Sequence, residues 1–379
     1  MTIDEIDQSD RDSENDTIIS SSSSSSSSLS NNSSYPDLYY DIELLSKATK
    51  RININTYLLK NDRIALKSAA FSCGGFINND LRLLVWPKLI NIDQSPLPSK
   101  LSKEIIKSNE WYHQVILDVD RSLKRFPPSV HEEKRILYQD SLTKVIIRVL
   151  CCNPSLHYYQ GYHDVCLTFL LMMDEENAFK IINKISNTHL KYFMEETMNT
   201  TSNLLEIIYL ILKDEDLHLY NYLIMSEVGT IFSLSWVITW FSHVLNDFND
   251  IARLFDFFIS SHFLMPIYLT VSILLYKKKQ IHNIDCDMAN MHQYLTGLPQ
   301  NETLPFDKLV MDTLHLSTKY PPEDTLQRQN EIKENALKGD NSRRIFKKNF
   351  QFIPRNMFSI TLVVLVGGVI YQIYSEYSK

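Results

Sequence analysis

The chain has 379 residues, of which 44% are hydrophobic, so it is long enough to bury one large core or two ordinary ones. Its net charge of −7 offers no attraction to the phosphates of nucleic acid, which select clustered Lys and Arg, and we exclude nucleic-acid binding. The five cysteines are odd in number and never spaced C-x-x-C, as expected of reduced thiols in a cytosolic domain.

Residues 1–38 are predicted to form a disordered, acidic and Ser-rich tail. Seven acidic residues and one arginine lie in the first sixteen positions, and an unbroken serine tract runs from Ser20 to Ser28. Almost nothing in this stretch can be buried to offset the entropy of ordering the backbone. We expect a solvated tail whose serines are acceptors for phosphorylation.

Residues 42–316 read as helices, and the expected fold class is all-α. Glycine is scarce, at 8 of 379 residues, and two-residue alternation is almost absent. Apolar residues recur at spacings of three and four, as in Leu204, Ile207, Ile208, Ile211 and Leu212. Prolines are expected to break the chain between helices, namely Pro87, Pro96, Pro98, Pro127, Pro128, Pro154, Pro266 and Pro299.

The first candidate functional residue is Arg121, in the pattern Val115-x-x-Asp118-x-x-Arg121. An arginine offers a planar cation that can neutralise charge developing on a transferred phosphoryl group. Spacing alone favours a plainer interpretation, in which Arg121 is a surface residue paired with Asp118 one turn away. The pattern by itself does not decide between the two.

The second candidate is Gln160, in the stretch Tyr158-Tyr-Gln-Gly-Tyr-His-Asp164, which is predicted to be a loop. A glutamine amide can both accept from and donate to an attacking water. The alternative is a polar turn residue that bonds its own backbone. Gly161 would let the chain turn sharply directly after the glutamine.

Two internal segments, 228–246 and 257–276, are uncharged and long enough to be read as membrane spans. Both carry polar or helix-interrupting residues, and a large all-α domain also needs helices that are apolar on every side. We expect core helices. A multi-pass membrane protein is the alternative.

The C-terminal part is predicted to be a charged linker over 319–356, a transmembrane anchor over 357–374 and a short lumenal tail over 375–379. The eighteen anchor residues span about 27 Å as a helix, which suits a thin bilayer. Basic residues precede them and place the N-terminus in the cytosol, namely Arg343, Arg344, Lys347, Lys348 and Arg355. The alternative is a terminal helix packed on the domain.

Other motifs are weak. The chain has no Walker A loop and no G-x-G-x-x-G, so it is not expected to bind nucleotide itself. His157 and His163 flank the glutamine but lack an obvious third zinc ligand. The stretch Asp285-Cys-Asp287 could bind a cation, but it is expected to cap the helix that contains Met288 to Leu295. We therefore expect no cofactor and no metal belonging to this chain.

Several of these motifs together resemble the TBC-domain family of Rab GTPase-activating proteins. The pattern around Arg121 and the pattern around Gln160 resemble that family's arginine-finger and glutamine-finger motifs. The segments from Gly75 to Pro87, Ser235 to His243 and Arg253 to Phe258 resemble its other helices. The likeness covers roughly residues 50–300 and is strongest to the family's tail-anchored subclass, fungal members included.

The resemblance implies a domain of two helical lobes over 39–318 that activates a GTPase in trans. Arg121 and Gln160 would be the catalytic residues, with GTP and Mg²⁺ carried by the partner, a GTP-bound Rab. The chain would be a catalytic activator, not a nucleotide hydrolase by itself. The subclass further implies a Rab of the early secretory pathway and a single-pass anchor in the endoplasmic reticulum membrane.

Four supporting residues accompany these two. Asp118 is expected to orient Arg121 or the glutamine loop, and Tyr159 to pack beneath that loop. Gly161 is expected to make the turn, and Asp164 to cap a helix over 165–172. Ser122 and Tyr162 depart from the family's usual threonine and methionine, and neither change touches the fingers. A catalytically inactive, membrane-anchored Rab-binding scaffold is the alternative function.

Overall fold

The computed structural model describes residues 35–92, 101–125 and 132–338, and within these ranges the chain contains helices and loops but no strand. The all-α class is confirmed. The predicted tail over 1–38 lies outside the described residues except for its last positions, because the first helix begins at Tyr35. The predicted anchor over 357–374 lies wholly outside them.

The described helices fall in chain order into two sets. The first set is α1 (Tyr35–Leu59), α2 (Arg63–Phe71), α3 (Asn79–Ile90), α4 (Lys103–Ser108), α5 (Tyr112–Arg125), α6 (Glu132–Cys152), α7 (Tyr162–Met172) and α8 (Glu175–Ser186). The second is α9 (Asn199–Leu205), α10 (Ile207–Glu215), α11 (Leu217–Met225), α12 (Leu234–Ile238), α13 (Phe248–Ser260), α14 (Met265–Tyr276), α15 (Lys278–Ile281), α16 (Met288–Asn301), α17 (Phe306–Lys319) and α18 (Pro322–Lys338). The second set also contains two 3-10 turns, η1 (Lys191–Phe193) and η2 (Ile231–Ser233).

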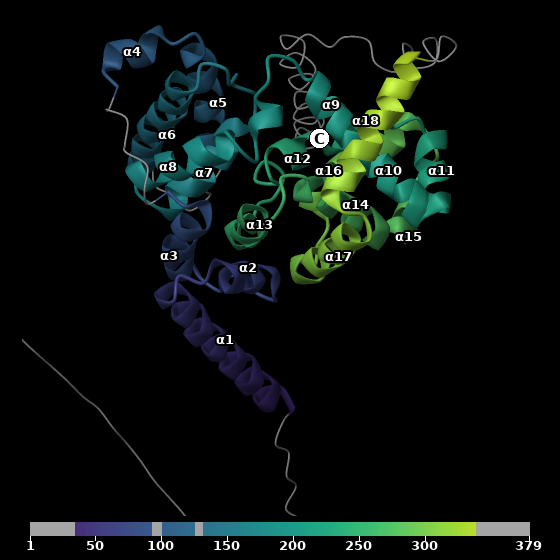
Figure 1. Ribbon diagram of the computed structural model, residues 1–379, viewed down its shortest axis with the longest axis horizontal. Coiled ribbons are helices and arrows are strands. Elements are labelled where there is room, and N and C mark those ends of the chain that lie inside the picture. The colour runs from purple at the N-terminus through teal and green to yellow at the C-terminus, as the bar shows by residue number, and fades with distance from the viewer. Residues whose placement is uncertain (1–34, 93–100, 126–131, 339–379) are drawn as a thin grey trace, which may run out of the picture. The chain divides into compact units, whose positions relative to one another are not determined.

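Residues up to Ser46 form a unit of their own, so the packing described here concerns residues 47–338. Helices α4 to α8 pack around α6, and α3 packs on α7 and α8. In the second set, α14 packs on α10, α12 and α17. Helix α13 packs on α2, α3 and α17 and so joins the two sets of helices, which are called the first and the second group below (Figure 1).

An aromatic cluster fills the junction between the groups. Trp86 of α3 is fully buried and packs edge-on against Phe169 of α7, with ring centroids 5.4 Å apart. Phe255 of α13 contacts both Phe169 and Trp240, at centroid distances of 5.3 and 5.2 Å. Such pairs add to the stabilisation that burial of large rings already gives. The junction is therefore rigid, and it lies beside the candidate site.

The two apolar internal segments are core elements, as predicted. They form η2, α12, the end of α13 and α14, and most of their side chains are buried. Of the helices that the structure describes, none is long and apolar enough to cross a bilayer.

Two of the proline predictions were wrong. Pro87 lies inside α3 and Pro299 inside α16, each within the last turn of its helix. A proline there removes a single hydrogen bond, and the helix then ends within three residues. Asn91 closes α3 in the left-handed conformation, with φ 60°. Capping of α16 by Asp287 was predicted correctly, because its carboxylate accepts a hydrogen bond from the Asn290 amide at 3.0 Å.

The linker prediction over 319–356 was wrong in its first half, which forms α18 and packs on α10. The Tyr268 hydroxyl lies 2.9 Å from the Thr325 hydroxyl and 2.7 Å from the Tyr320 carbonyl. Arg328 pairs with Asp214 of α10. Polar contacts hold this helix, so apolar periodicity did not reveal it.

Candidate functional site

Arg121 lies on the outer face of α5, one turn before the helix ends. The inner face is buried through Val115 and Val119, both 0% exposed. The Arg121 side chain is 58% exposed, and its Nη1 is 3.6 Å from Oδ1 of Asp118. The guanidinium is therefore tethered on one side and open to solvent on the other.

Asp118 is buried beneath Arg121, with a side chain 1% exposed. Its Oδ2 accepts from Nε2 of Gln114 at 3.0 Å and from the Tyr158 hydroxyl at 3.1 Å. Its Oδ1 has no hydrogen-bond partner among the described residues and faces the guanidinium. The contact is longer than a hydrogen bond and open to solvent on the arginine side, so Asp118 keeps Arg121 nearby through a weak attraction only.

Tyr158 connects Asp118 to the glutamine loop. Its hydroxyl donates to Asp118 and accepts from Nδ1 of His163 at 2.9 Å. Burial first, and then the neighbouring Asp118 charge, raise the pKa of Tyr158 well above its usual value, so the hydroxyl keeps its proton. Asp118 was expected to orient Arg121 or the glutamine loop, and in the structure it contacts both segments. The sequence did not single out Tyr158 as the connection.

Gln160 lies directly before the turn, half-buried. Its Oε1 is inaccessible to solvent and has no hydrogen-bond partner among the described residues. An unsatisfied buried amide oxygen costs roughly 1–3 kcal/mol. Oε1 is therefore an acceptor that the described residues leave unused, and the side chain must turn outward before a water or a donor from a partner can reach it.

Gly161 makes the turn between the glutamine and α7, with φ 102°. A Cβ at this position would lie 2.7 Å from Cγ2 of Thr239. The positive φ and the lack of room for a Cβ atom both favour glycine at this position. Thr239 belongs to the other group of helices, so the loop is wedged between the two groups.

Tyr159 packs beneath the loop, as predicted. Its side chain is 4% exposed, and its hydroxyl donates to the Ile238 carbonyl at 2.7 Å. The ring lies 5.6 Å from that of Tyr162. Burial raises the Tyr159 pKa well above its usual value, so this hydroxyl also remains a donor.

The capping prediction for Asp164 was wrong. Helix α7 begins at Tyr162, and its N-cap is Gly161, with no side-chain cap. Asp164 lies in the first turn and faces the second group of helices, where its Oδ2 accepts from Nδ1 of His243 at 2.7 Å. His163 Nε2 is 3.5 Å from the same oxygen. The glycine turn starts the helix three residues early, which frees Asp164 to fix the loop against His243.

The arrangement joins the two predicted catalytic residues by a short route through buried polar groups. Asp118 contacts Arg121 and Tyr158, and Tyr158 lies two residues before Gln160. Sequence reasoning did not assign roles to Tyr158, Gln114, Thr239 or His243. The motif contained Tyr158, but only the fold could bring His243 and Thr239 to it.

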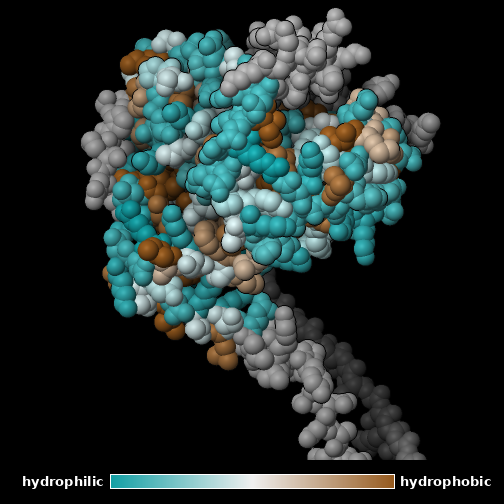
Figure 2. Space-filling view, turned by 45° about the vertical axis from the view of Figure 1, so that its right-hand side comes forward, coloured by the Kyte–Doolittle hydropathy of each residue, from teal (hydrophilic) through white to brown (hydrophobic). Residues whose placement is uncertain are grey.

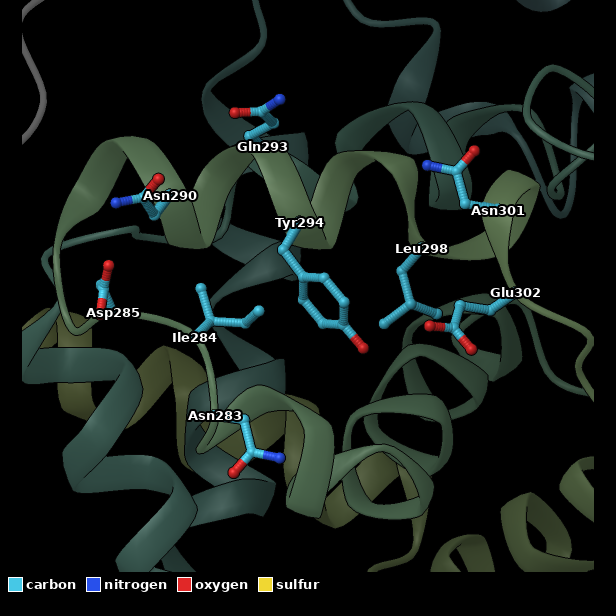
Figure 3. A pocket seen from close by; sticks show the side chains of 9 residues that line it. All are labelled: Asn283, Ile284, Asp285, Asn290, Gln293, Tyr294, Leu298, Asn301 and Glu302. Atoms are coloured by element: carbon cyan, nitrogen blue, oxygen red, sulfur yellow. The ribbon is translucent and has the colours of Figure 1, made fainter.

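The candidate site lies apart from the pocket that the structure shows along α16. An open pocket of about 420 Å³ lies along α16, lined among others by Asn290, Tyr294 and Glu302, with the Tyr294 ring pointing into it (Figure 3). None of the site residues described above lines this pocket. An exposed arginine and a loop glutamine with an unpaired oxygen, connected through Asp118 and Tyr158, are suited to completing a reaction centre on another molecule.

Comparison with known proteins gives consistent results. The family model described as Rab-GTPase-TBC domain matches residues 79–282. TBC1 domain family member 20 from Homo sapiens is 43% identical over 263 residues, which is 69% of this chain and 65% of that protein. GTPase-activating protein gyp10 from Schizosaccharomyces pombe is 30% identical over 70% of this chain and 75% of its own length.

Solved structures share the fold. A crystal structure of the Chlamydomonas flagellar RabGAP TBC domain has a TM-score of 0.56 at 13% identity, covering 74% of this chain and 95% of that one. The Ypt/Rab-GAP domain of Gyp1p has a TM-score of 0.50 at 14% identity, covering 68% and 94%. At this identity the likeness concerns the fold alone.

Proposed function

The chain belongs to the Rab-GTPase-TBC domain family, and we propose that it is a GTPase-activating protein for a Rab of the early secretory pathway. The observation that carries the proposal is the pairing of an exposed, tethered Arg121 with a loop that presents Gln160. The relative gyp10, named a GTPase-activating protein, is matched over 75% of its length and supports the proposal, whereas the match spans 65% of the human relative.

In the proposed mechanism the partner brings GTP and Mg²⁺, and the chain supplies two side chains. Hydrolysis passes through a loose transition state with charge spread over the transferred phosphoryl group. Arg121 stabilises that charge, and it costs little to release because its tie to Asp118 is long and solvent-exposed. Gln160 accepts a hydrogen bond from the attacking water. The chain needs no cofactor of its own.

We further propose that residues 357–374, outside the described part of the chain, anchor it in the endoplasmic reticulum membrane with the domain in the cytosol. Their uncharged composition and the preceding cations support this. An N-glycosylation acceptor appended after Lys379 tests the topology. We expect its glycosylation, and an unmodified acceptor on a chain that washes off membranes would contradict the anchor.

The activity is tested by single-turnover GTP hydrolysis with the full chain and a panel of purified, GTP-loaded Rabs. We expect strong acceleration of a Rab of the early secretory pathway. If no Rab is accelerated by a folded chain, the GAP proposal fails. Stable binding to one GTP-bound Rab in that case would identify the scaffold function instead.

A further inference from the structure

Charge is unevenly distributed along the domain. Residues 47–92, which form most of α1 together with α2 and α3, contain eight Lys and Arg but only two acidic residues, a net charge of +6. Residues 93–338 contain 23 Lys and Arg and 31 acidic residues, a net charge of −8. Some of the early cations are used internally, since Arg82 pairs with Asp256 and Lys50 bonds the Cys73 carbonyl. Arg51, Lys60, Arg63 and Lys67 are exposed.

The exposed cations concentrate at the α1–α2 corner, which we define as residues 59–67. The corner also holds Leu59 and Ile64, which are 89% and 81% exposed and are the two most exposed large apolar side chains of the described residues. Lys60, Arg63 and Lys67 are exposed beside them. In Figure 2, hydrophobic and hydrophilic side chains intermingle at the lower end of the described surface, where α1, α2 and α3 lie.

The corner is held in this form by the domain. Asp62, its only acidic residue, accepts a hydrogen bond from the Ala65 amide at 3.0 Å and caps α2. Leu66 is fully buried, and α2 packs on α3 and α13. The guanidinium of Arg63 donates to Oδ1 of Asn91 at the end of α3, at 2.5 Å. These contacts keep Leu59 and Ile64 pointing away from the core, although burying them would be favourable.

We propose that the α1–α2 corner binds an anionic lipid bilayer. Leu59 and Ile64 enter the headgroup–acyl boundary, and Lys60, Arg63 and Lys67 contact lipid phosphates and carboxylates. Exposed apolar groups flanked by cations are the composition that interfacial binding requires, and each cation near an anionic membrane surface strengthens binding about fivefold. An anionic surface with an apolar layer beneath it complements both features of the corner at once.

The acidic tail at residues 1–16 is the competing occupant. It complements the charge, with seven acidic residues, but its only apolar residues are Met1, Ile3 and Ile6, in a polar sequence. It would therefore leave Leu59 and Ile64 poorly covered. The bilayer complements the corner better.

Bilayer contact at the corner is compatible with an open catalytic surface. Helix α2 lies at one end of the unit formed by residues 47–338, and α4 and α5 lie at the other (Figure 1). Helix α5, which carries Arg121, would then lie at the far end of this unit from the bilayer. The proposal depends neither on GTPase activation nor on the C-terminal anchor.

Photo-crosslinking tests the proposal on the full chain. The photoreactive residue p-benzoylphenylalanine replaces Ile64 in one variant and Met225 in a matched control. Met225 is 72% exposed on α11. Each is irradiated with phosphatidylcholine vesicles that contain or lack phosphatidylserine, and adducts are identified by mass spectrometry. We expect lipid adducts at position 64 with the anionic vesicles and at least about fivefold fewer with neutral ones.

Charge variants complete the test. In the position-64 variant, the combined changes Lys60→Gln, Arg63→Gln and Lys67→Gln should lower the lipid adduct at least about fivefold. Changing three exposed lysines elsewhere to Gln should leave it unchanged, namely Lys103, Lys107 and Lys184. Equal lipid adducts at positions 64 and 225 would overturn the proposal. So would adducts at position 64 with the chain's own tail or with a second copy.

Discussion

Arg82 and Arg121 each lie beside a buried aspartate, but the two pairs differ in almost every other respect. The Arg82 side chain is 5% exposed and donates from Nε and Nη2 to Asp256 at 3.0–3.1 Å. Asp256 also accepts from Nε1 of Trp86 at 2.8 Å and from the Phe76 amide at 3.0 Å. Arg121 is 58% exposed and makes one 3.6 Å contact with an aspartate oxygen that has no hydrogen bond among the described residues.

The difference shows how a structural arginine can be told from a functional one. Arg82 and Asp256 satisfy each other in the junction, so neither can serve a ligand without unfolding the site. Arg121 keeps most of its donors available, while Asp118 holds its position. A bidentate buried pair is strong but fixed, and a long exposed contact is weak enough to exchange. Four mutations test this contrast and the way in which the glutamine loop is held.

The largest effect is expected for Arg121→Ala. We expect GTPase activation to fall about 10³- to 10⁵-fold, because the cation at the transition state is lost. Stability to urea should change by no more than about 1 kcal/mol, since the contact with Asp118 is solvent-exposed. Single-turnover hydrolysis and urea unfolding measure the two quantities. A variant with full activity would refute the role of Arg121, and a variant that fails to fold would place Arg121 in the same class as Arg82.

Asp256→Asn should have the opposite profile. It leaves Arg82 buried without its counter-charge, so we expect a loss of about 3–5 kcal/mol in the free energy of unfolding. Activity per folded molecule should be unchanged, because the side-chain partners of Asp256 are Phe76, Arg82 and Trp86 and none belongs to the glutamine loop. Urea denaturation followed by circular dichroism gives the stability. A loss below about 1 kcal/mol would show that the junction pair is not structural.

Gly161→Ala tests whether the turn after Gln160 is packed tightly between the two groups of helices. The φ of 102° and the 2.7 Å approach of Thr239 Cγ2 predict a destabilisation of about 1–3 kcal/mol. Adding Thr239→Ser removes that methyl group and should recover part of the loss. Gly229→Ala is the matched control, because its φ is 62° but no atom lies within 4 Å of the new Cβ. Equal losses at the two glycines would mean that backbone strain alone is responsible.

Tyr158→Phe should have the smallest effect and separate positioning from stability. Without its hydroxyl, Asp118 loses one donor and no longer contacts the glutamine loop. We expect kcat of the activated reaction to fall about tenfold with KM nearly unchanged, because only the placement of the fingers is disturbed. Tyr159→Phe is the control, since its hydroxyl bonds the Ile238 carbonyl instead. It should reduce stability by about 1 kcal/mol and leave kcat intact. If Tyr159→Phe lowered kcat more than Tyr158→Phe did, the connection from Asp118 to the glutamine loop through Tyr158 would be excluded.

Local sequence patterns predicted the helices and the core well. The recurrence of apolar residues around Ile207 and Ile211 reflects burial on one helix, and both side chains are at most 1% exposed. Membrane-like runs such as 257–276 were placed correctly in the core. Helix α18 was missed because its contacts with the domain include polar ones, such as that between Thr325 and Tyr268, and these leave no periodic apolar signal.

The motifs predicted which residues to look for at the site, but not how they are held. The contact of Asp118 with Tyr158 spans 40 residues, and that of Asp164 with His243 spans 79. The first contact depends on how α5 packs against the loop before α7, and the second on how the two groups of helices dock. Residue spacing encodes neither. The misplaced cap at Asp164 has the same origin, because a glycine turn had replaced the side-chain cap that the sequence suggested.

The most direct test of the central claim uses a partner Rab whose own water-positioning glutamine has been changed to alanine. Single-turnover GTP hydrolysis is measured with the wild-type chain and with Gln160→Ala. If Gln160 orients the attacking water, the wild-type chain will still accelerate this Rab strongly and the variant will not. If the wild-type chain fails on the altered Rab, or if Gln160→Ala remains fully active on it, the glutamine of the partner performs that step and the account given for Gln160 is wrong.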